Sequence, residues 1–278
     1  MPQLMPYFTF YGGKFRAAPH YPRPKFDSIV EPFAGAAGYS LRYHTLDVTL
    51  VEVDPVIANL WRYIIRETAE GFRRLPALVD GSVDDLHVCQ EARWLIGFWL
   101  NKGAASPCKT PSAWMRSGIR PNSYWGQAII DRLVRQAGLV AHWKVIEGDY
   151  ALAPNVRATH FVDPPYEGAG RLYRYSDVDY ARLGAWCRTR VGQTIVCENV
   201  GAAWLPFAPF REIKSTPGKR GKGRSAEAIW VSESDASFPP PGWHPHPDAP
   251  GWYHDYRECL TEGQLRARMT SPSMEAAR

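Results

Sequence analysis

The chain has 278 residues, of which 45% are hydrophobic, and its formal net charge is +5. This length and apolar content fit one large α/β domain with an insertion, or two small domains. The five cysteines are odd in number, widely spaced and without a C-x-x-C pair, which excludes a disulfide framework and a zinc knuckle and indicates a reducing setting. No secretory signal is predicted, and the longest apolar run, at 94–100, is too short to span a bilayer. We therefore expect a cytoplasmic protein without a membrane partner, whose mildly basic charge permits binding to nucleic acid.

Seven short runs, rich in β-branched or aromatic residues and bounded by turn formers, predict buried strands. These runs are residues 28–33, 48–53, 143–148, 160–163, 193–199, 210–215 and 226–232. Apolar residues at helical spacing predict helices over 55–75, 91–101, 127–138 and 179–190, the first of which starts at Pro55. Strands that alternate with helices favour an α/β fold with a doubly wound, mostly parallel sheet.

Two regions depart from this alternation. Residues 55–142 contain a long helical stretch and a loop rich in Pro, Ser and Gly, which predicts a helical insertion between the second and third strands. Residues 235–278 form a C-terminal tail that is too rich in proline for a regular element, so we expect it to be extended. The predicted core is then formed by residues 1–54 and 143–234.

The first chemical signal is the segment EPFAGAAGYS at 31–40, directly after the first strand. Gly35 and Gly38 leave room for backbone N–H groups to approach a ligand, and a following helix N-terminus would add a favourable dipole. Glu52 ends the second strand, where an acid can bind the two hydroxyls of a ribose. This combination indicates a cofactor that contains a nucleoside; tight packing of a strand on a helix is the alternative. The spacing matches neither a phosphate loop nor G-x-G-x-x-G.

The second signal is HFVDPPYEG at 160–168, which follows the fourth strand. The carboxylate of Asp163 and a backbone carbonyl held by proline can accept hydrogen bonds from an amino group. The ring of Tyr166 can lie against a planar ring. These features suit an exocyclic amine on a nucleobase; a strand-ending Asp-Pro turn with a packed tyrosine is the alternative.

Taken together, these motifs resemble the Dam-like family of DNA adenine methyltransferases. DPPY at 163–166 matches the catalytic motif of that family, and EPFAGAAG resembles its cofactor-binding motif. The remaining similar segments, in the same order as in the family, are FYGGK (10–14), VEVDPVIANLW (51–61), FWLNK (98–102), GDY (148–150), CENVG (197–201) and RSAEAIWVS with Glu227. The resemblance extends from about residue 7 to 233.

The resemblance implies a Rossmann-like methyltransferase sheet of seven strands, the last antiparallel, with a helical target-recognition insertion. It implies transfer of a methyl group from S-adenosyl-L-methionine to the N6 amine of adenine at specific sites in double-stranded DNA. The cofactor-binding residues that it implies are Phe10, Tyr11, Gly12, Lys14, Glu31, Pro32, Phe33, Gly35, Gly38, Glu52, Asp54, Asp149, Tyr150 and Asp163. A monomer is expected, and no metal is required.

The DPPY residues have separate roles in this hypothesis. The adenine would have to leave the base stack, because its amine cannot reach a deep pocket from inside a duplex. Asp163 and the Pro164 carbonyl would accept the two N–H bonds of the amine and stabilise the positive charge that develops on it. Pro165 would stiffen the loop, and Tyr166 would stack on the flipped base.

Contacts to DNA are predicted in two places. The segment KSTPGKRGKGR at 214–224 offers phosphate contacts, and the insertion offers residues that can read bases. The candidates are Lys102, Lys109, Arg116, Arg120 and Asn122 in the insertion, and Lys219, Arg220, Lys222 and Arg224 in the basic segment. After Lys102 the chain departs from the family pattern, so the recognition sequence stays open. A solvated basic hairpin is the alternative for 214–224.

Two other functions remain as alternatives. One is methylation of adenine in RNA, or of an amide in a protein; Asp163 argues against the amide, because glutamine methyltransferases of similar fold carry Asn at that position. The other is an inactive relative that only binds DNA, against which the intact Gly35, Glu52 and Tyr166 argue. Whether such an enzyme would belong to a restriction–modification pair, a phage or host regulation is left open by the sequence.

Overall fold

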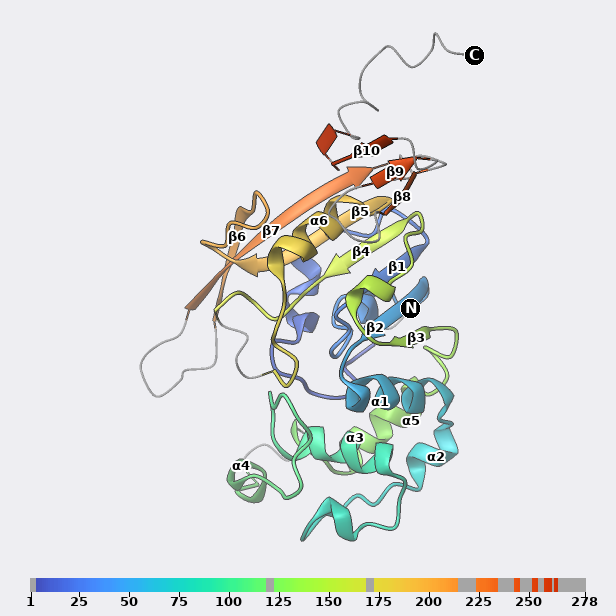
Figure 1. The fold of residues 1–278 in the computed structure, drawn as a ribbon. Helices are drawn as coiled ribbons and strands as arrows, with labels where there is room; N and C mark the ends of the chain where they lie inside the picture. The colour runs from blue at the N-terminus through green and yellow to red at the C-terminus, as the bar shows by residue number, and fades with distance from the viewer. Residues whose placement is uncertain are drawn as a thin grey trace.

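The computed structural model describes residues 4–118, 123–168, 173–214, 224–234, 243–245, 252–254, 258–261 and 263–264. A seven-stranded sheet forms its centre (Figure 1). In spatial order its strands are β3 (Lys144–Glu147), β2 (Asp47–Glu52), β1 (Ser28–Glu31), β4 (Ala158–Val162), β5 (Gly192–Asn199), β7 (Arg224–Ser234) and β6 (Ala208–Lys214). The pairs among β3, β2, β1, β4 and β5 are parallel, and β7 is antiparallel to both of its neighbours. All seven predicted strands, and the antiparallel last one, are confirmed.

The central strands read as continuous apolar runs because both faces of the sheet are covered. Every residue of β4 is buried, and β5 is buried except at its last residue, Asn199. At its start, β5 approaches β4 so closely that a Cβ on Gly192 would lie 2.3 Å from the carbonyl oxygen of Ala158. This close approach is a reason for glycine at that position.

The predicted helices are present with shifted ends. They are α1 (Pro55–Arg66) with α2 (Ala69–Arg73), α3 (Gln90–Leu100), α5 (Gln127–Gln136) and α6 (Tyr180–Arg188). A further short helix, α4 (Ala113–Arg116), lies in the segment that was expected to be a loop. The single helix expected over 55–75 is two helices, because Thr68 starts a new one: its side chain accepts a hydrogen bond from the Gly71 amide at 3.0 Å. Pro55 does occupy the first turn of α1.

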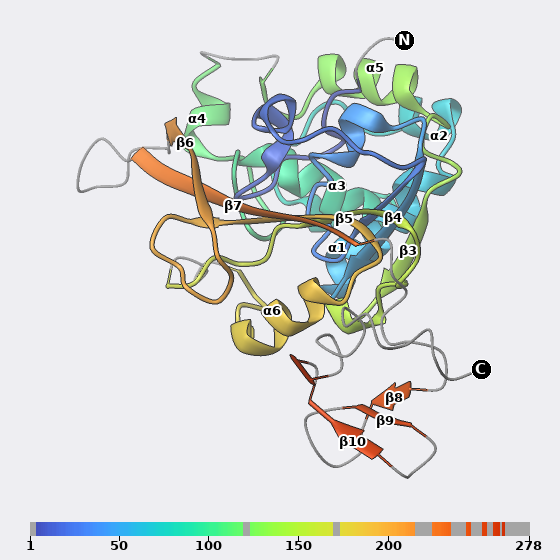
Figure 2. The same cartoon turned by 90° about the horizontal axis from the view of Figure 1, so that it is seen from above.

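Residues 55–142 contain helices and, among the described residues, no strand. Figure 1 shows α1, α3 and α5 gathered at one end of the sheet, and Figure 2 shows α3 and α5 on the opposite side of the sheet from α6. Phe98 of α3 and Leu133 of α5 belong to the same hydrophobic cluster as Ile29 of β1 and Leu50 of β2. The helices of this segment therefore share one core with the sheet.

The C-terminal tail contains more regular structure than expected. Three short strands, β8 (Trp243–Pro245), β9 (Trp252–His254) and β10 (Glu258–Leu260), pair antiparallel in a separate sheet. The expectation that proline excludes a regular element there was wrong for these strands. They are only three residues long, and Pro245 ends an edge strand, a position at which the missing N–H is tolerated.

The strand order places a crevice at a defined position. From β1 the chain proceeds to β2 on one side, whereas β4 pairs with β1 on the other side. In open α/β sheets, ligands bind at the carboxyl ends of the strands where the order reverses in this way. The segments after β1, β2 and β4 are those that carry the predicted motifs.

Candidate active site

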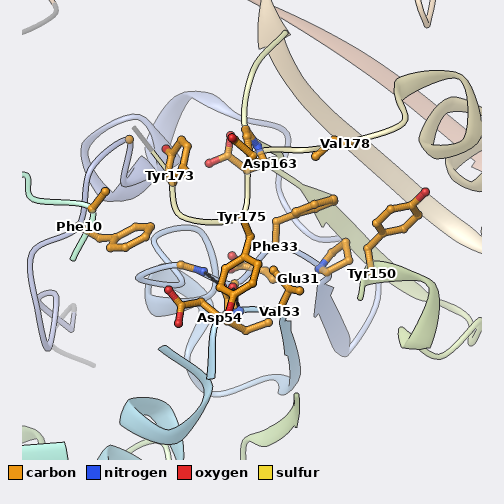
Figure 3. A pocket seen from close by; sticks show the side chains of 18 of the residues that line it. Phe10, Glu31, Phe33, Val53, Asp54, Tyr150, Asp163, Tyr173, Tyr175 and Val178 are labelled. Carbon is orange, nitrogen blue, oxygen red and sulfur yellow. Dashed lines mark hydrogen bonds between the residues drawn. The ribbon is translucent and has the colours of Figure 1, made fainter. Parts of the chain in front are cut away.

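A cavity of about 530 Å³ opens at the carboxyl ends of β1, β2 and β4 (Figure 3). Its size suits a ligand of several rings, since small-molecule sites span roughly 300–1,000 Å³. All residues predicted to bind the cofactor line this cavity: Phe10, Tyr11, Gly12, Lys14, Glu31, Pro32, Phe33, Gly35, Gly38, Glu52, Asp54, Asp149, Tyr150 and Asp163. The fold therefore brings together segments up to about 150 residues apart in the chain, although binding itself stays a prediction.

The glycine-rich turn differs in detail from the expectation. The Gly35 amide donates to Oε2 of Glu52 at 2.9 Å, and the Gly35 carbonyl accepts from Nε1 of Trp61 at 2.7 Å. The Gly35 N–H, expected to face a ligand, is thus used to hold Glu52. Gly35 has φ +44°, a left-handed conformation that glycine adopts without strain.

Gly38 allows two backbone segments to lie close together. A Cβ at this position would lie 2.4 Å from the amide nitrogen of Phe15. The absence of a side chain lets the N-terminal segment with Lys14 reach the glycine-rich turn. The segment after Gly38 is a short 3-10 helix (Ser40–Tyr43), so the helix dipole expected there is small.

Two acids, Glu52 and Glu31, line the cavity. Glu52 also accepts from the Asp54 amide at 3.0 Å, and burial raises its pKa to about 7. Glu31 is 2% exposed and accepts from the Ser40 amide at 2.7 Å, and burial raises its pKa to about 8. Each oxygen of Glu52 carries one such bond and has a second lone pair left for a hydroxyl donor.

Asp54 has a structural role that the sequence analysis did not assign. Its Oδ1 accepts from the Val56 amide at 2.9 Å and so caps α1. Asp149 does the same for a 3-10 helix (Tyr150–Leu152), through the Ala151 amide at 2.9 Å. Both residues also line the cavity, so capping and ligand binding are compatible roles.

An ion pair between Lys14 and Asp163 also lines the cavity. Nζ of Lys14 is 2.8 Å from Oδ1 of Asp163, with side chains 9% and 19% exposed. Burial alone would lower the pKa of Lys14, but the carboxylates of Asp163 and Glu227 outweigh it and the pKa lies above its ordinary value. Burial raises the pKa of Asp163, while Lys14 and Tyr166 oppose that rise. Lys14 is therefore a fixed cation beside Asp163.

Of the other three DPPY residues, one lines the cavity and two do not. Pro165 lines the cavity with Asp163, whereas Pro164 and Tyr166 are not among the lining residues. Tyr166 packs against the main hydrophobic cluster, and Nζ of Lys14 lies 4.7 Å from its ring centroid. Stacking of a base on Tyr166, and hydrogen bonding to the Pro164 carbonyl, stay predictions.

Aromatic rings form one wall of the cavity. The rings of Phe33 and Tyr150 stack with centroids 5.4 Å apart, and Figure 3 shows both side chains at the same end of the site. Tyr150 is 6% exposed, so it contributes mainly through packing. Val53, which follows Glu52, is 38% exposed and lines the cavity. An apolar surface beside an acid fits a nucleoside, whose base is flat and whose sugar carries hydroxyls.

One part of the site, residues 173–179, was not predicted from the sequence. Residues 173–179 line the cavity as a strap that follows the DPPY loop. The hydroxyl of Tyr173 donates to the Tyr11 carbonyl at 3.2 Å, and its ring packs on Phe10 and Tyr11. A Cβ on Gly12 would lie 2.1 Å from that hydroxyl, which is the local reason for glycine there. The tyrosines of YRYS were the signal in the sequence, but no spacing marked them.

Some of the residues predicted to contact DNA lie within the described part of the chain and others do not. Lys102, Lys109 and Arg116 are exposed in the insertion; Lys109 is ion-paired with Asp84 at 2.6 Å, and Nζ of Lys102 lies 5.6 Å from the ring centroid of Tyr124. Arg120, Asn122, Lys219, Arg220 and Lys222 lie outside the described residues, and Arg224 is described only as the first residue of β7.

Comparison of the chain with protein-family models and with curated proteins returned no match. Among the described residues, no helix combines the length and apolar character needed to cross a bilayer. In the same part of the chain, no group of three or more His, Cys, Asp or Glu side chains is arranged to hold a metal ion. The case for a function therefore depends on the geometry of the cavity.

Proposed function

We propose that the chain is a site-specific DNA methyltransferase that transfers a methyl group from S-adenosyl-L-methionine to N6 of a flipped adenine. One observation carries the proposal: Asp163 and Pro165 line the same cavity as Glu52 and the glycine-rich turn. The acid proposed to bind the ribose and the acid proposed to bind the amine thus face one cavity. This is the arrangement that a transfer between a nucleoside cofactor and a nucleobase amine requires.

The residues present fit such a cofactor. Glu52 would accept hydrogen bonds from the ribose hydroxyls, Val53 and Phe33 would offer apolar contact to the base, and Asp149 would accept from its exocyclic amine. When bound, S-adenosyl-L-methionine supplies a methyl group on a positively charged sulfur. Glu31 is buried and lines the cavity; its carboxyl holds a proton in the fold below about pH 8, and a cationic ligand beside it would favour the charged carboxylate.

Asp163 would act on the second reactant. Its carboxylate would accept an N–H bond of the adenine amine, with the Pro164 carbonyl as the second acceptor. Both acceptors would favour a pyramidal nitrogen and stabilise the positive charge that develops during transfer. Lys14 would hold Asp163 in place through their ion pair. Tyr166 would offset part of the cost of base flipping, since stacking on an aromatic contributes roughly 1–3 kcal/mol per base.

The same proposal includes target recognition, the partner, the oligomeric state and the cellular setting. Residues 55–142 would carry the target-recognition elements, and double-stranded DNA would be the partner. A monomer is the proposed oligomeric state. A bacterial cytoplasm, where the chromosome or phage DNA lies, would be the setting.

The test is methyl transfer from labelled S-adenosyl-L-methionine to duplex DNA. Sequencing of DNA from a methylation-deficient host that expresses the chain would show N6-methyladenine at one sequence context. Asp163→Ala should abolish the transfer while cofactor binding, measured by calorimetry, persists. Label on RNA alone would indicate an RNA adenine methyltransferase, and no label with retained DNA binding would indicate an inactive relative; both results contradict the proposal.

A further inference from the structure

The two peptide groups that flank Tyr166 are both held by side chains. The carbonyl of Pro165 accepts from the Tyr180 hydroxyl at 2.7 Å. The amide of Glu167 donates to Oε2 of Glu198 at 3.2 Å. Burial, with the charges of Glu198 and Glu167, raises the pKa of Tyr180 to about 12, so its hydroxyl stays a donor at neutral pH. The backbone on either side of Tyr166 is thus fixed from outside the loop.

The two anchors belong to one cluster. Tyr180 begins α6 and Glu198 lies near the end of β5, while Trp204 follows β5 in the next loop. Nε1 of Trp204 donates to Oε2 of Glu198 at 3.2 Å, and the rings of Trp204 and Tyr180 pack with centroids 5.6 Å apart. Oε1 of Glu198 accepts from the Asn199 amide at 2.8 Å. Both oxygens of this fully buried carboxylate are therefore in use.

None of these three side chains lines the cavity. Their hydrogen bonds reach the DPPY loop, so an effect of these bonds on a reaction is expected to pass through that loop. Fixing the peptides before and after Tyr166 fixes its backbone, and with it the direction of the ring and of the neighbouring proline carbonyls. Reactive sites require supporting residues that hold contact groups within about 0.5 Å of the productive geometry.

We propose that Tyr180, Glu198 and Trp204 are positioning residues that hold the DPPY loop in the geometry for methyl transfer; we call them the loop anchor. This inference rests on the proposed function. The loop anchor acts on the rate of transfer through Tyr166 and Asp163, and it does not contribute to cofactor binding.

The sharpest variant is Tyr180→Phe, which removes one hydroxyl and keeps the ring contact with Trp204. Its matched control is Tyr7→Phe, because the Tyr7 hydroxyl also donates to a carbonyl, that of Gln136, at the same distance of 2.7 Å and outside the cavity. Tyr180→Phe should lower kcat about tenfold, as expected for loss of about one hydrogen bond. Its KM for DNA and its Kd for S-adenosyl-L-methionine should stay within about twofold. Tyr7→Phe should leave kcat unchanged.

Glu198 supplies a second comparison within the loop anchor. Glu198→Gln keeps the shape and one acceptor oxygen, whereas Glu198→Ala loses both. The loss of kcat should therefore be smaller in the glutamine variant than in the alanine variant. Equal losses in the two variants would contradict the proposed role of the carboxylate.

Hydrogen exchange gives a readout that does not depend on the reaction. The amides of Tyr166 and Glu167 should exchange faster in Tyr180→Phe than in wild type or Tyr7→Phe. Unchanged exchange, or equal kcat in the two tyrosine variants, overturns the inference. If the wild type transfers no methyl group, the proposed function fails and the role in transfer fails with it, whereas the exchange result still decides whether the loop anchor holds the loop.

Discussion

Lys14 and Asp163 lie 149 positions apart in the chain, and their side chains form an ion pair of 2.8 Å at the wall of the cavity. Both are largely removed from solvent, so neither charge is well screened by water. Removing one partner from a buried pair leaves the other charge without compensation, which costs about 3 kcal/mol or more. The pair therefore couples the stability of the fold to the proposed chemistry.

Asp163→Asn should lower the rate of methyl transfer by roughly 10²–10³-fold, because a neutral amide stabilises the developing positive charge poorly. It should also lower the free energy of unfolding by about 3 kcal/mol, since the Lys14 ammonium stays buried. Urea unfolding followed by fluorescence measures the second effect. Asp84→Asn is the control: it breaks the exposed pair with Lys109, and solvent screening makes that loss small. Equal destabilisation in both variants would show that the buried pair has no special role.

A side chain at Gly12 should detach the strap of residues 173–179 from the N-terminal segment on which Tyr173 packs. In Gly12→Ala the new Cβ would meet the Tyr173 hydroxyl at 2.1 Å, and the φ of +72° adds backbone strain of about 1 kcal/mol. We expect weaker binding of S-adenosyl-L-methionine by calorimetry and a lower melting temperature.

Two variants separate the clash from the strain in that experiment. Gly138→Ala has a similar φ of +78° but nothing within 4 Å, so it should show the strain alone. Adding Tyr173→Phe to Gly12→Ala removes the clashing oxygen and should restore part of the binding. If the double variant binds no better than Gly12→Ala, the contact between Gly12 and Tyr173 does not control the strap.

Glu31 should make stability fall as pH rises. Its pKa is 4.5 when exposed and about 8 in the fold, where burial disfavours the charge. Below about pH 4.5 both states hold the proton and there is no effect. Between about pH 4.5 and 8 the unfolded chain loses its proton while the folded chain keeps it, so stability decreases; above about pH 8 the loss is constant.

Glu31→Gln has no charge to bury and keeps an acceptor for the Ser40 amide. The free energy of unfolding of the variant, relative to that of wild type, should therefore rise by on the order of 3 kcal/mol from pH 5 to pH 8. Calorimetric melting at both pH values measures this difference. Asp85→Asn is a fair control, because that carboxylate also accepts a backbone amide, from Ser82 at 3.1 Å, but is exposed. A gain of the same size in the control would refute burial of Glu31 as the cause.

Arg116 and Lys109 should differ in their contribution to DNA binding. Arg116 is exposed at the end of α4, whereas Lys109 is engaged by Asp84. Arg116→Ala should reduce the slope of log affinity against log salt by about 0.9, the value for one phosphate contact. Lys109→Ala should change it less. Fluorescence anisotropy with a random duplex over a salt series measures both, and identical slopes in wild type and Arg116→Ala would exclude a phosphate contact.

The strands and most of the helices follow from the sequence alone, and the motifs of the chain indicate the cavity residues outside the strap of residues 173–179. The reason is local: β-branched runs between turn formers specify strands, and Pro55 specifies the start of α1 whatever packs against them. Strand ends then place Glu52 and Asp163 at the same edge of a parallel sheet. Such regularities can be read without knowing any distant contact.

The partner of each of these residues, in contrast, depends on contacts that form in the folded chain. The Gly35 amide bonds Glu52 instead of facing a ligand, Lys14 pairs with Asp163, and Tyr180 holds the Pro165 carbonyl. These contacts join residues that are separated in the chain by a loop or by a longer segment. No periodic pattern in the sequence predicts them. They depend on the pairing of β1 with β4 and on the packing of α6, because those arrangements bring the polar groups within hydrogen-bonding distance.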